Sequence, residues 1–362
     1  MSSRANFRKL FSALVITALF AVCAGVSQIR AAEPDQELLQ DAQSNFKSLA
    51  PNLDSSKASP DMVDLGRKLF FDPRISVDGT VSCMRCHQIG LYATDSLPKS
   101  RGAHDELLPR NAPTILNVRL NFKMHWRGDF KNVEEQATHA LTGPGFANPN
   151  LETAMLRIKA IPGYDELFRK AFPKEPDPVS ADNWGNAIGA YERTLATPSR
   201  FDKFLDGSVD ALTAEERHGL RTFIDVGCIN CHNGEGVGGQ EFEKFGVYTD
   251  YWKETCSQEI DPGRYSLTKN SDDMYVFKVP VLRNVAMTPP YFHDGSVAAL
   301  AEAVKIMAKV QLGKSLSDTD KTAIVAFLTS LTGTLPDDYA KSPLLPAAGY
   351  MSAPSVSHSE KP

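Results

Sequence analysis

The sequence Cys-Met-Arg-Cys-His occupies residues 83–87, and Cys-Ile-Asn-Cys-His follows at residues 228–232, 145 positions further along a chain of 362 residues. Each pentapeptide is the pattern at which a c-type haem is attached: two thiols bond to the haem vinyl groups, and the following His becomes the proximal iron ligand. A zinc site would place its remaining ligands within about 12 to 20 residues, and a thioredoxin-like dithiol needs no His at the fifth position. The two copies therefore predict two covalently bound haem c groups.

Cysteine usage agrees with this prediction. One of the six cysteines lies in the leader described below, and four are used by the two motifs. The expected attachment residues are Cys83, Cys86, Cys228 and Cys231, and the expected proximal ligands are His87 and His232. Cys256 is left without a partner for an intramolecular disulfide, and we expect it to be a small buried apolar side chain.

The N-terminus has the pattern of a secretory signal peptide. Three basic residues precede an apolar run over residues 10–26, and small residues follow up to about residue 32. This order is typical of a cleaved leader, and the run is too short to favour a retained membrane anchor. We expect residues 1–32 to be removed and the mature protein to be periplasmic, without stable membrane insertion. A lipoprotein is less favoured, because Val22 before Cys23 fits such a signal poorly.

The charge of the mature chain bears on its partners. Loss of residues 1–32 would remove four basic residues and no acidic one, which leaves 35 basic against 44 acidic side chains, a formal charge of −9. No basic stripe is available to bind phosphate, so nucleic acid is not an expected partner. A moderately acidic surface would suit a basic or dipolar electron donor.

Hydrophobic spacing predicts a mainly α-helical chain with long irregular loops. A helix capped by Ser59 precedes the first motif, and a capping box from Thr213 to Glu216 opens a helix before the second. The same unit, a short amphipathic helix, thus introduces each motif. This repetition indicates an internal duplication that forms two cytochrome-like domains.

The domain limits follow from the helices between and after the motifs. A helix with Trp184, Ile188 and Tyr191 at helical spacing should close the first domain, and a helix from about Ser317 should close the second. We place the N-terminal haem domain at residues 33–205, the C-terminal haem domain at 206–345, and a disordered tail rich in Ala, Ser and Pro at 346–362.

Several segments around these motifs resemble the bacterial dihaem cytochrome c peroxidases. They are KLFFDPR at 68–74, RNAPT at 110–114, GGQ at 238–240, FKVP at 277–280 and YFHDGS at 291–296. The resemblance runs from about Asp61 to Pro346. It implies two mostly helical class-I cytochrome c-like domains, each with one haem c, in which the first haem is peroxidatic and the second passes electrons to it.

The resemblance also implies a sixth ligand for each iron. Met307 falls at the position of the family's Met ligand on the second haem, where a thioether raises the haem potential. A plain core position on a helix is the alternative for Met307. The more distant enzymes that mature methylamine dehydrogenase carry Tyr at this place. His104, in a loop over residues 97–108, matches the displaceable ligand of the first haem, and His125 is its rival.

Two further sites are implied by the same likeness. Trp126 matches the Trp that lies between the haems, although the charged residues around Gly128 are exchanged relative to the family pattern. Asn111 and the backbone carbonyls of Thr288 and Pro290 match a calcium site between the domains, and such oxygen ligands suit a hard cation. A plain turn is the alternative to calcium.

One departure from the family concerns the proton relay that peroxide reduction needs. The family uses a Gln and, ten residues later, a Glu; Gln136 matches the first, but Phe146 stands at the second. General acid–base help is worth about 10²–10⁴-fold, and Phe cannot supply it. His139 is our hypothesis for the replacement, with Glu152 as a second possibility; either residue could instead simply lie at the surface.

These features predict a periplasmic cytochrome-c peroxidase. It would reduce hydrogen peroxide to water with electrons from a small c-type cytochrome or a cupredoxin, and the resemblance implies a homodimer. Phe146 keeps two alternatives open: a related dihaem c oxidase acting on another substrate, and a non-catalytic electron-transfer or redox-sensing protein.

Overall fold

The computed structural model describes residues 34–49, 58–337, 339 and 341–346. The expected signal peptide lies outside the described residues, as does the expected tail beyond Pro346. Contacts divide the chain into residues 1–37 and residues 38–362, and the second of these units contains both motifs. No described helix is long and apolar enough to cross a membrane.

Described residues form mainly α-helices, as predicted. The helices are α2 (Pro34–Asn45), α3 (Pro60–Phe71), α4 (Val133–Ala140), α5 (Leu151–Ala160), α6 (Tyr164–Ala171), α7 (Ala181–Glu192), α8 (Arg200–Leu205), α9 (Ala214–Val226), α10 (Tyr251–Thr255), α11 (Tyr265–Thr268), α12 (Leu300–Leu312) and α13 (Asp318–Ser330). One antiparallel pair, β1 (Phe242–Lys244) and β2 (Val276–Lys278), joins Phe242 to Lys278 in register.

Short 3₁₀ helices lie in the loops between these elements. They are η2 (Pro73–Ile75), η3 (Cys83–Arg85), η4 (Ile89–Leu91), η5 (Ala103–Asp105), η6 (Val118–Leu120), η7 (Val209–Ala211), η8 (Cys228–Asn230), η9 (Ser271–Asp273) and η10 (Val285–Met287). Two of them, η3 and η8, contain the Cys residues that open the two motifs.

The helix starts follow from local capping. Ser59 accepts a hydrogen bond from the Met62 N–H at the start of α3, and Thr213 and Glu216 form the predicted capping box of α9. Ser317 caps α13. The predicted cap of α3, the predicted capping box of α9 and the predicted start of a helix near Ser317 are confirmed, and α3 and α9 each lie ahead of one motif.

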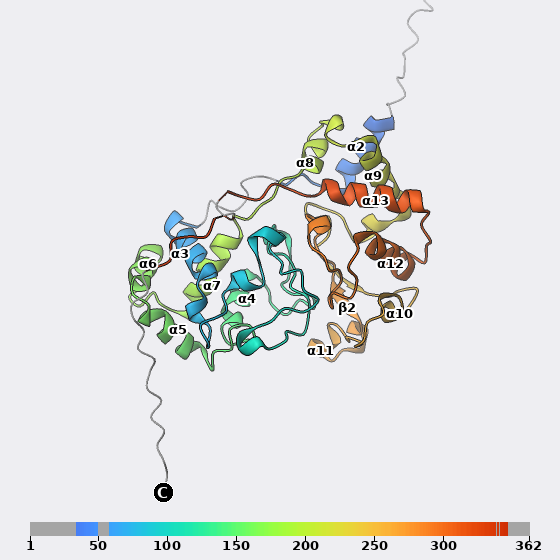
Figure 1. The fold of residues 1–362 in the computed structure, drawn as a ribbon. Helices are drawn as coiled ribbons and strands as arrows, with labels where there is room; N and C mark the ends of the chain where they lie inside the picture. Colours follow the sequence, from blue (N-terminus) through green and yellow to red (C-terminus); the bar gives the residue numbers. More distant parts are fainter. Residues whose placement is uncertain (1–33, 50–57, 338, 340, 347–362) are drawn as a thin grey trace, which may run out of the picture. The chain divides into compact units, whose positions relative to one another are not determined.

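Two main hydrophobic cores lie within the unit. The first packs α3 to α7 together, on the left of Figure 1; the second packs α8, α9 and α13, on the right, together with Leu38 to Phe46. A smaller cluster surrounds α12 with Tyr291 and Val297. The N-terminal residues 38–46 therefore pack with the second core although they precede the first motif in sequence.

The two cores are built on the same helix crossing. Gly66 in α3 faces Ala187 in α7, and a Cβ at Gly66 would lie 1.8 Å from the Ala187 carbonyl oxygen. Gly219 in α9 faces Ala323 in α13, and a Cβ there would also lie 1.8 Å from the facing carbonyl oxygen. Only glycine allows two helices to approach this closely. The crossing supports the predicted internal duplication.

Aromatic rings repeat the same arrangement one turn further along. Phe70 and Tyr191 meet with ring centroids 5.4 Å apart at 63°, and Phe223 and Phe327 meet at 5.3 Å and 60°. Each of the two Phe rings on α3 and α9 also lies near the His of its own motif, at 6.5 and 6.4 Å. The two helix pairs thus present the two motifs in the same way.

Candidate haem sites

The first motif is a tight turn that leaves one ring nitrogen of its His free to bind a metal. The His87 N–H donates to the Cys83 carbonyl oxygen over 3.0 Å, and the chain then loops back so that Gln88 pairs with Thr94. This loop brings the Ala93 carbonyl oxygen 3.0 Å from His87 Nδ1. A carbonyl can only accept, so Nδ1 carries the hydrogen and Nε2 is left free to bind a metal.

The second motif repeats the turn with a different environment for its ring. The His232 N–H donates to the Cys228 carbonyl oxygen over 3.0 Å. His232 Nδ1 is buried near the carbonyls of Val237 and Pro280, but it has no hydrogen bond of good geometry among the described residues. Burial lowers the pKa of His232 to about 4, and burial lowers the pKa of His87 as well. Both imidazoles are therefore neutral, as metal ligands must be.

The donor set fits a c-type haem at each motif. Cys83, Cys86, Cys228 and Cys231 are all unbridged and half-buried. Each pair of thiols stands directly before a neutral His whose ring lies near a Phe ring of the preceding helix. Among the described residues, only Cys231, Glu241 and Glu243 gather as three groups of metal-binding type. Since Cys231 belongs to the second motif, this cluster does not indicate a separate metal centre.

The expected sixth ligands lie in different settings. Met307 is half-buried in α12 and packs against the cluster around Tyr291 and Val297, so its ligand role stays a prediction. His104 lies in η5 with its side chain 67 % exposed, and its Nδ1 is 3.9 Å from an Asp78 carboxylate oxygen. The ligand role of His104 likewise stays a prediction.

The rival ligand His125 is near enough to the first motif for the charge of His87 to affect its pKa. The surrounding protein desolvates the ring and lowers the pKa of His125, and the charges of Arg127 and His87 lower it further. Its Nδ1 lies 3.8 Å from the Asp129 carboxylate, which raises that pKa only in part. At 3.8 Å this contact is too long for a hydrogen bond, and the His125 side chain is 45 % exposed, so its ligand role stays a prediction.

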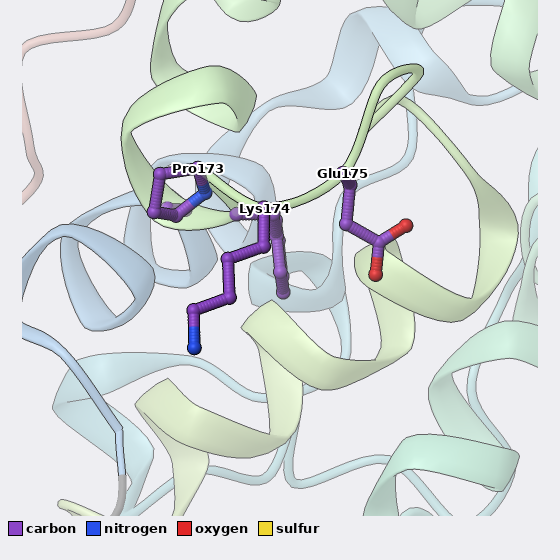
Figure 2. A pocket seen from close by; sticks show the side chains of 5 residues that line it. Pro173, Lys174 and Glu175 are labelled. Carbon is purple, nitrogen blue, oxygen red and sulfur yellow. The ribbon is translucent and has the colours of Figure 1, made fainter.

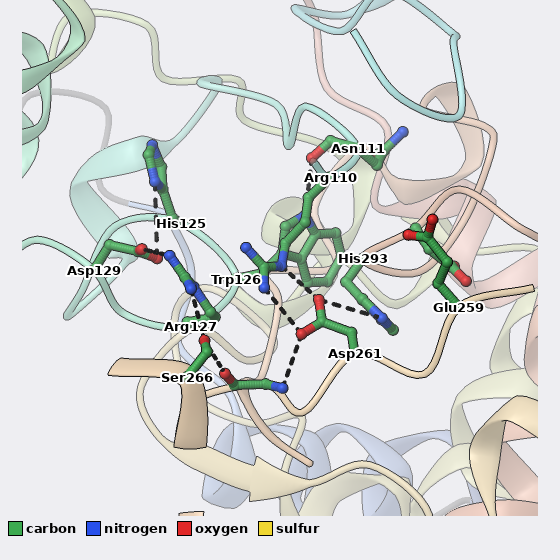
Figure 3. A network of polar contacts seen from close by, with 12 residues as sticks. Arg110, Asn111, His125, Trp126, Arg127, Asp129, Glu259, Asp261, Ser266 and His293 are labelled. Atoms are coloured by element: carbon green, nitrogen blue, oxygen red, sulfur yellow. Dashed lines mark hydrogen bonds and ion pairs between the residues drawn. The ribbon is translucent and has the colours of Figure 1, made fainter. Parts of the chain in front are cut away.

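Trp126 joins segments that are far apart in the sequence (Figure 3). Its indole Nε1–H donates to the Asn111 carbonyl oxygen over 2.9 Å, and its own carbonyl accepts from the Lys278 N–H over 2.7 Å. Its ring meets His293 edge to face at 6.5 Å. The predicted inter-haem residue is therefore bonded both to the 110s loop and to Lys278, the last residue of β2.

A half-buried ion pair beside Trp126 was not foreseen from the sequence. Arg110 binds both carboxylate oxygens of Asp261 at 2.7 and 2.9 Å, and His293 Nε2 lies 3.8 Å from the same carboxylate. His293 is 2 % exposed and stacks on Phe277 at 4.4 Å. Burial alone would raise the pKa of Asp261, but hydrogen bonds and the charge of Arg110 lower it. The group lies beside Trp126 and contacts it through the His293 ring (Figure 3).

The predicted calcium ligands are partly engaged in other bonds. Asn111 is 8 % exposed; its Nδ2 donates to the Leu97 carbonyl oxygen over 2.9 Å, and its backbone N–H donates to His293. Its side-chain oxygen is thereby oriented away from Leu97. Thr288 and Pro290 follow η10. The calcium site stays a prediction.

Phe146 is part of the first hydrophobic core. It is 4 % exposed and meets Trp184 edge to face at 6.1 Å. A carboxylate here would be buried without a cationic partner, which costs several kcal/mol. The apolar residue at this position is thus explained by its packing.

The other relay candidates lie on α4 and α5. Gln136 is half-buried, and His139, three residues on along the same helix face, is exposed and stacks on Phe130 at 5.0 Å. Phe130 in turn meets His125 edge to face at 5.0 Å. Glu152 is exposed in the first turn of α5. His139 is thus the candidate that shares an aromatic stack with a residue near the first motif.

Cys256 is exposed, which contradicts the expectation of a buried side chain. It follows the short helix α10 in a left-handed conformation, with φ of 54°. A residue that ends a short surface helix in this way turns its side chain outward. The error came from treating the residue type as evidence of burial.

Two surface hollows lie away from both motifs. Figure 2 shows one of about 260 Å³, lined by residues 171–175 at the end of α6. Another, of about 350 Å³, lies between α6 and residues 344–346. No predicted site residue lines either hollow, so neither competes with the motifs as the functional site.

Comparison with known proteins agrees with the interpretation of the motifs. Residues 60–210 match the family model described as di-haem cytochrome c peroxidase. The cytochrome c551 peroxidase of Pseudomonas aeruginosa is 44 % identical over 79 % of this chain and 82 % of its own. That of Nitrosomonas europaea is 39 % identical over 94 % of this chain and 95 % of its own.

More distant relatives show the same relationship. The methylamine utilization protein MauG of Methylorubrum extorquens is 32 % identical over 78 % of this chain and 78 % of its own. The crystal structure of a MauG-like protein associated with microbial copper homeostasis superposes with a TM-score of 0.69 at 28 % identity, covering 82 % of this chain and 95 % of the other. The chain belongs to the di-haem cytochrome c peroxidase family, and the predicted enzyme class, a cytochrome-c peroxidase, is confirmed with it.

Proposed function

We propose that this protein is an exported di-haem peroxidase that reduces hydrogen peroxide to water with electrons from a small c-type cytochrome or a cupredoxin. The observation that carries the proposal is the pair of neutral, half-buried His residues, each following a Cys-x-x-Cys turn beside the same kind of helix crossing. The names of the most similar relatives support a donor of the cytochrome c551 type.

Each haem would be held by one copy of the motif. Cys83, Cys86 and His87 would hold the peroxidatic haem, and the corresponding residues of the second motif, with Met307 as sixth ligand, the electron-transfer haem. When bound, haem supplies an iron that changes its redox state and, where a coordination position is open, accepts a small ligand. His104 is the proposed displaceable ligand of the first iron, with His125 as its rival.

The overall reaction takes two electrons from two reduced donor molecules and two protons per peroxide, and yields two waters. Trp126 would lie on the electron path, because it is bonded to segments that belong to both halves of the chain. The half-buried ion pair of Asp261 and Arg110 would keep Trp126 and its neighbours rigid, which limits the reorganisation that electron transfer requires.

The proton relay would use Gln136 and His139 in place of the family's Gln and Glu. Gln136 would hold the peroxide by hydrogen bonds. An imidazole nitrogen of His139 would accept the proton from one peroxide oxygen and return it to the other, so that water can leave. Phe146 would exclude water from this side of the pocket.

The domain organisation, localisation and assembly belong to the same proposal. We place one class-I cytochrome c-like domain in each of residues 33–205 and 206–345, and the packing of residues 38–46 and of α8 on the second core favours counting them with the second domain. The protein would be periplasmic and homodimeric, with a calcium ion bound through Asn111, Thr288 and Pro290 between the domains.

The direct test is peroxide-dependent oxidation of a reduced small cytochrome c by the calcium-loaded protein, after reduction of its high-potential haem. We expect rapid turnover in the unmodified chain. His139→Ala should lower turnover by about 100-fold, because general acid–base help is worth at least that much. His218→Ala is the matched control, since His218 is an exposed histidine of α9 that lies 3.7 Å from Asp320.

Full turnover by His139→Ala would remove His139 from the relay but leave the peroxidase proposal standing. No turnover by the unmodified chain, with both haems intact, would favour a related dihaem oxidase with another substrate, for which the buried Phe146 is the evidence. Failure of both irons to bind peroxide or carbon monoxide would instead indicate an electron-transfer or redox-sensing protein.

A further inference from the structure

The described residues after α13 return to the first core. We name residues 333–337, 339 and 341–346 the C-terminal strap. Gly333 pairs with Ser199, and a Cβ at Gly333 would lie 2.1 Å from the Thr197 carbonyl oxygen, so the strap begins against the segment before α8. From there it leaves α13 and the second core.

The strap is fastened to the first core along its length. Leu335 and Leu345 pack against the first core. Arg67 in α3 donates to the Lys341 carbonyl oxygen over 2.6 Å, and Arg74 in η2 donates to the Pro346 carbonyl oxygen over 3.1 Å. These contacts join residues more than 270 positions apart in sequence.

One strap residue touches the first motif itself. Tyr339 is fully buried, with 0 % of its surface exposed, and its hydroxyl donates to the His87 carbonyl oxygen over 2.9 Å. Burial raises the pKa of Tyr339, so the phenol keeps its hydrogen. A second tyrosine, Tyr92, reaches from the other side: its hydroxyl lies 3.4 Å from the Gly333 carbonyl oxygen. The strap thus contacts both ends of the loop from His87 to Ala93.

That loop decides where the His87 ring points. Its closing bonds, between Gln88 and Thr94, present the Ala93 carbonyl to His87 Nδ1. The second motif has a different support: within the described part of the chain no hydroxyl donates to the His232 carbonyl, and the following loop is instead held by Arg283, which donates to the Glu235 carbonyl oxygen over 2.6 Å. The tyrosine contact therefore distinguishes the first motif from the second.

We propose that Tyr339 is a positioning residue for the proximal ligand of the first haem, and that the C-terminal strap sets the orientation and basicity of His87 through the hydrogen bond to its carbonyl. The proposal rests on the assignment of His87 as a proximal ligand in the proposed function.

The effect of Tyr339 on the first haem has two steps. The hydrogen bond from Tyr339 fixes the peptide that begins the loop, and the fixed loop keeps the Ala93 carbonyl on Nδ1. A hydrogen bond from Nδ1–H makes the opposite ring nitrogen a stronger electron donor and so favours the oxidised iron. Loss of the tyrosine hydroxyl should loosen the loop, weaken that bond and raise the potential of the first haem.

The test uses Tyr339→Phe in the full chain carrying both haems, which removes one hydroxyl and keeps the ring in its core position. Amide hydrogen exchange should speed up in residues 88–94 and stay unchanged in residues 228–237. In a redox titration the midpoint potential of the low-potential haem should shift upward, while that of the high-potential haem stays where it was. The iron–histidine stretching frequency of the low-potential haem in its reduced form should fall.

Tyr251→Phe is the matched control. Tyr251 is also fully buried and its hydroxyl also bonds a backbone carbonyl, that of Asp261 at 3.1 Å, but it lies in the second half of the chain. It should leave the low-potential haem unchanged. Should Tyr339→Phe not fold, Arg67→Gln weakens the strap at Lys341 and should give a smaller upward shift.

Unchanged potentials of both haems, or equal shifts in both, would overturn the proposal. Its failure is separable from failure of the proposed function, because potentials and exchange are read without peroxide. A chain that binds two haems but does not turn over peroxide can still show the shift, and an active peroxidase can lack it.

Discussion

The two haem motifs of this chain share a scaffold and differ in what surrounds it. In both, a glycine lets one helix cross another, and a Phe ring one turn later lies about the same distance from the motif's His. On the facing helix, however, Tyr191 and Glu192 of the first region stand where Phe327 and Leu328 stand in the second.

The difference places a buried carboxyl group near Cys83 of the first motif, at the position that Leu328 takes in the second region. Glu192 is 5 % exposed, and burial raises its pKa to about 8, so it is a neutral carboxylic acid at neutral pH. Tyr339 adds a hydroxyl on the His87 carbonyl. The two regions thus share a backbone crossing and differ in the polarity around their motifs, and polarity around a haem is one of the variables that set what its iron can do.

The largest effect is expected from removing an attachment thiol. Cys86→Ser and Cys231→Ser should each lower haem content from two to about one per chain, measured by the pyridine haemochrome spectrum. If the regions have the assigned roles, the first variant should retain the high-potential haem and the second should lose it. Loss of the same haem in both variants would contradict the assignment.

The two regions also differ in how exposed the cation of an ion pair is. Asp202 binds Arg283, which is 0 % exposed at its side chain, whereas Asp72 binds Arg74, whose side chain is 23 % exposed. Asp202→Ala leaves a buried unpaired cation and should lower the free energy of unfolding by about 3–5 kcal/mol.

Asp72→Ala is the comparison variant. Arg74 can turn to water, so the loss should be smaller, about 1–3 kcal/mol, and should come mainly from the buried Tyr164 hydroxyl that also bonds Asp72. Urea unfolding of the two variants measures both values. A loss at Asp72 as large as that at Asp202 would show that exposure of the cation does not decide the cost.

The buried acid should give the first region a pH dependence. A carboxyl whose folded pKa is raised above its unfolded value favours folding when protonated, so its contribution is lost as pH rises from about 5 to 8. The slope should approach 1.4 kcal/mol per pH unit in that window. Thermal or urea unfolding across pH should show it in the unmodified chain and lose it in Glu192→Gln, while Leu328→Met leaves it intact.

The two helix crossings should lose similar amounts of stability when their glycines are replaced by alanine. Gly66→Ala and Gly219→Ala each force a Cβ against a facing carbonyl and should lower the free energy of unfolding by about 1–3 kcal/mol. Gly90→Ala, in a loop where nothing lies within 4 Å of the added atom, is the control. Unequal losses at the two crossings would show that the duplication is less close than the geometry indicates.

The features that depend on near neighbours in the chain were predicted from the sequence. The two motifs, the caps at Ser59, Thr213 and Ser317, and the amphipathic helices before each motif all arise from residues a few positions apart. Their local chemistry is enough to specify a turn, a cap or a helix face. The family followed from the same short segments.

Only the tertiary structure decided what surrounds each motif. The hydroxyl of Tyr339 meets the carbonyl of His87 across 252 positions, and Asp261 meets Arg110 across 151. Phe146 packs on Trp184 in the first core, and Cys256 is exposed at the end of α10. No local pattern encodes such contacts, since they depend on how distant segments pack, and it is this packing that makes two similar haem motifs into two different sites.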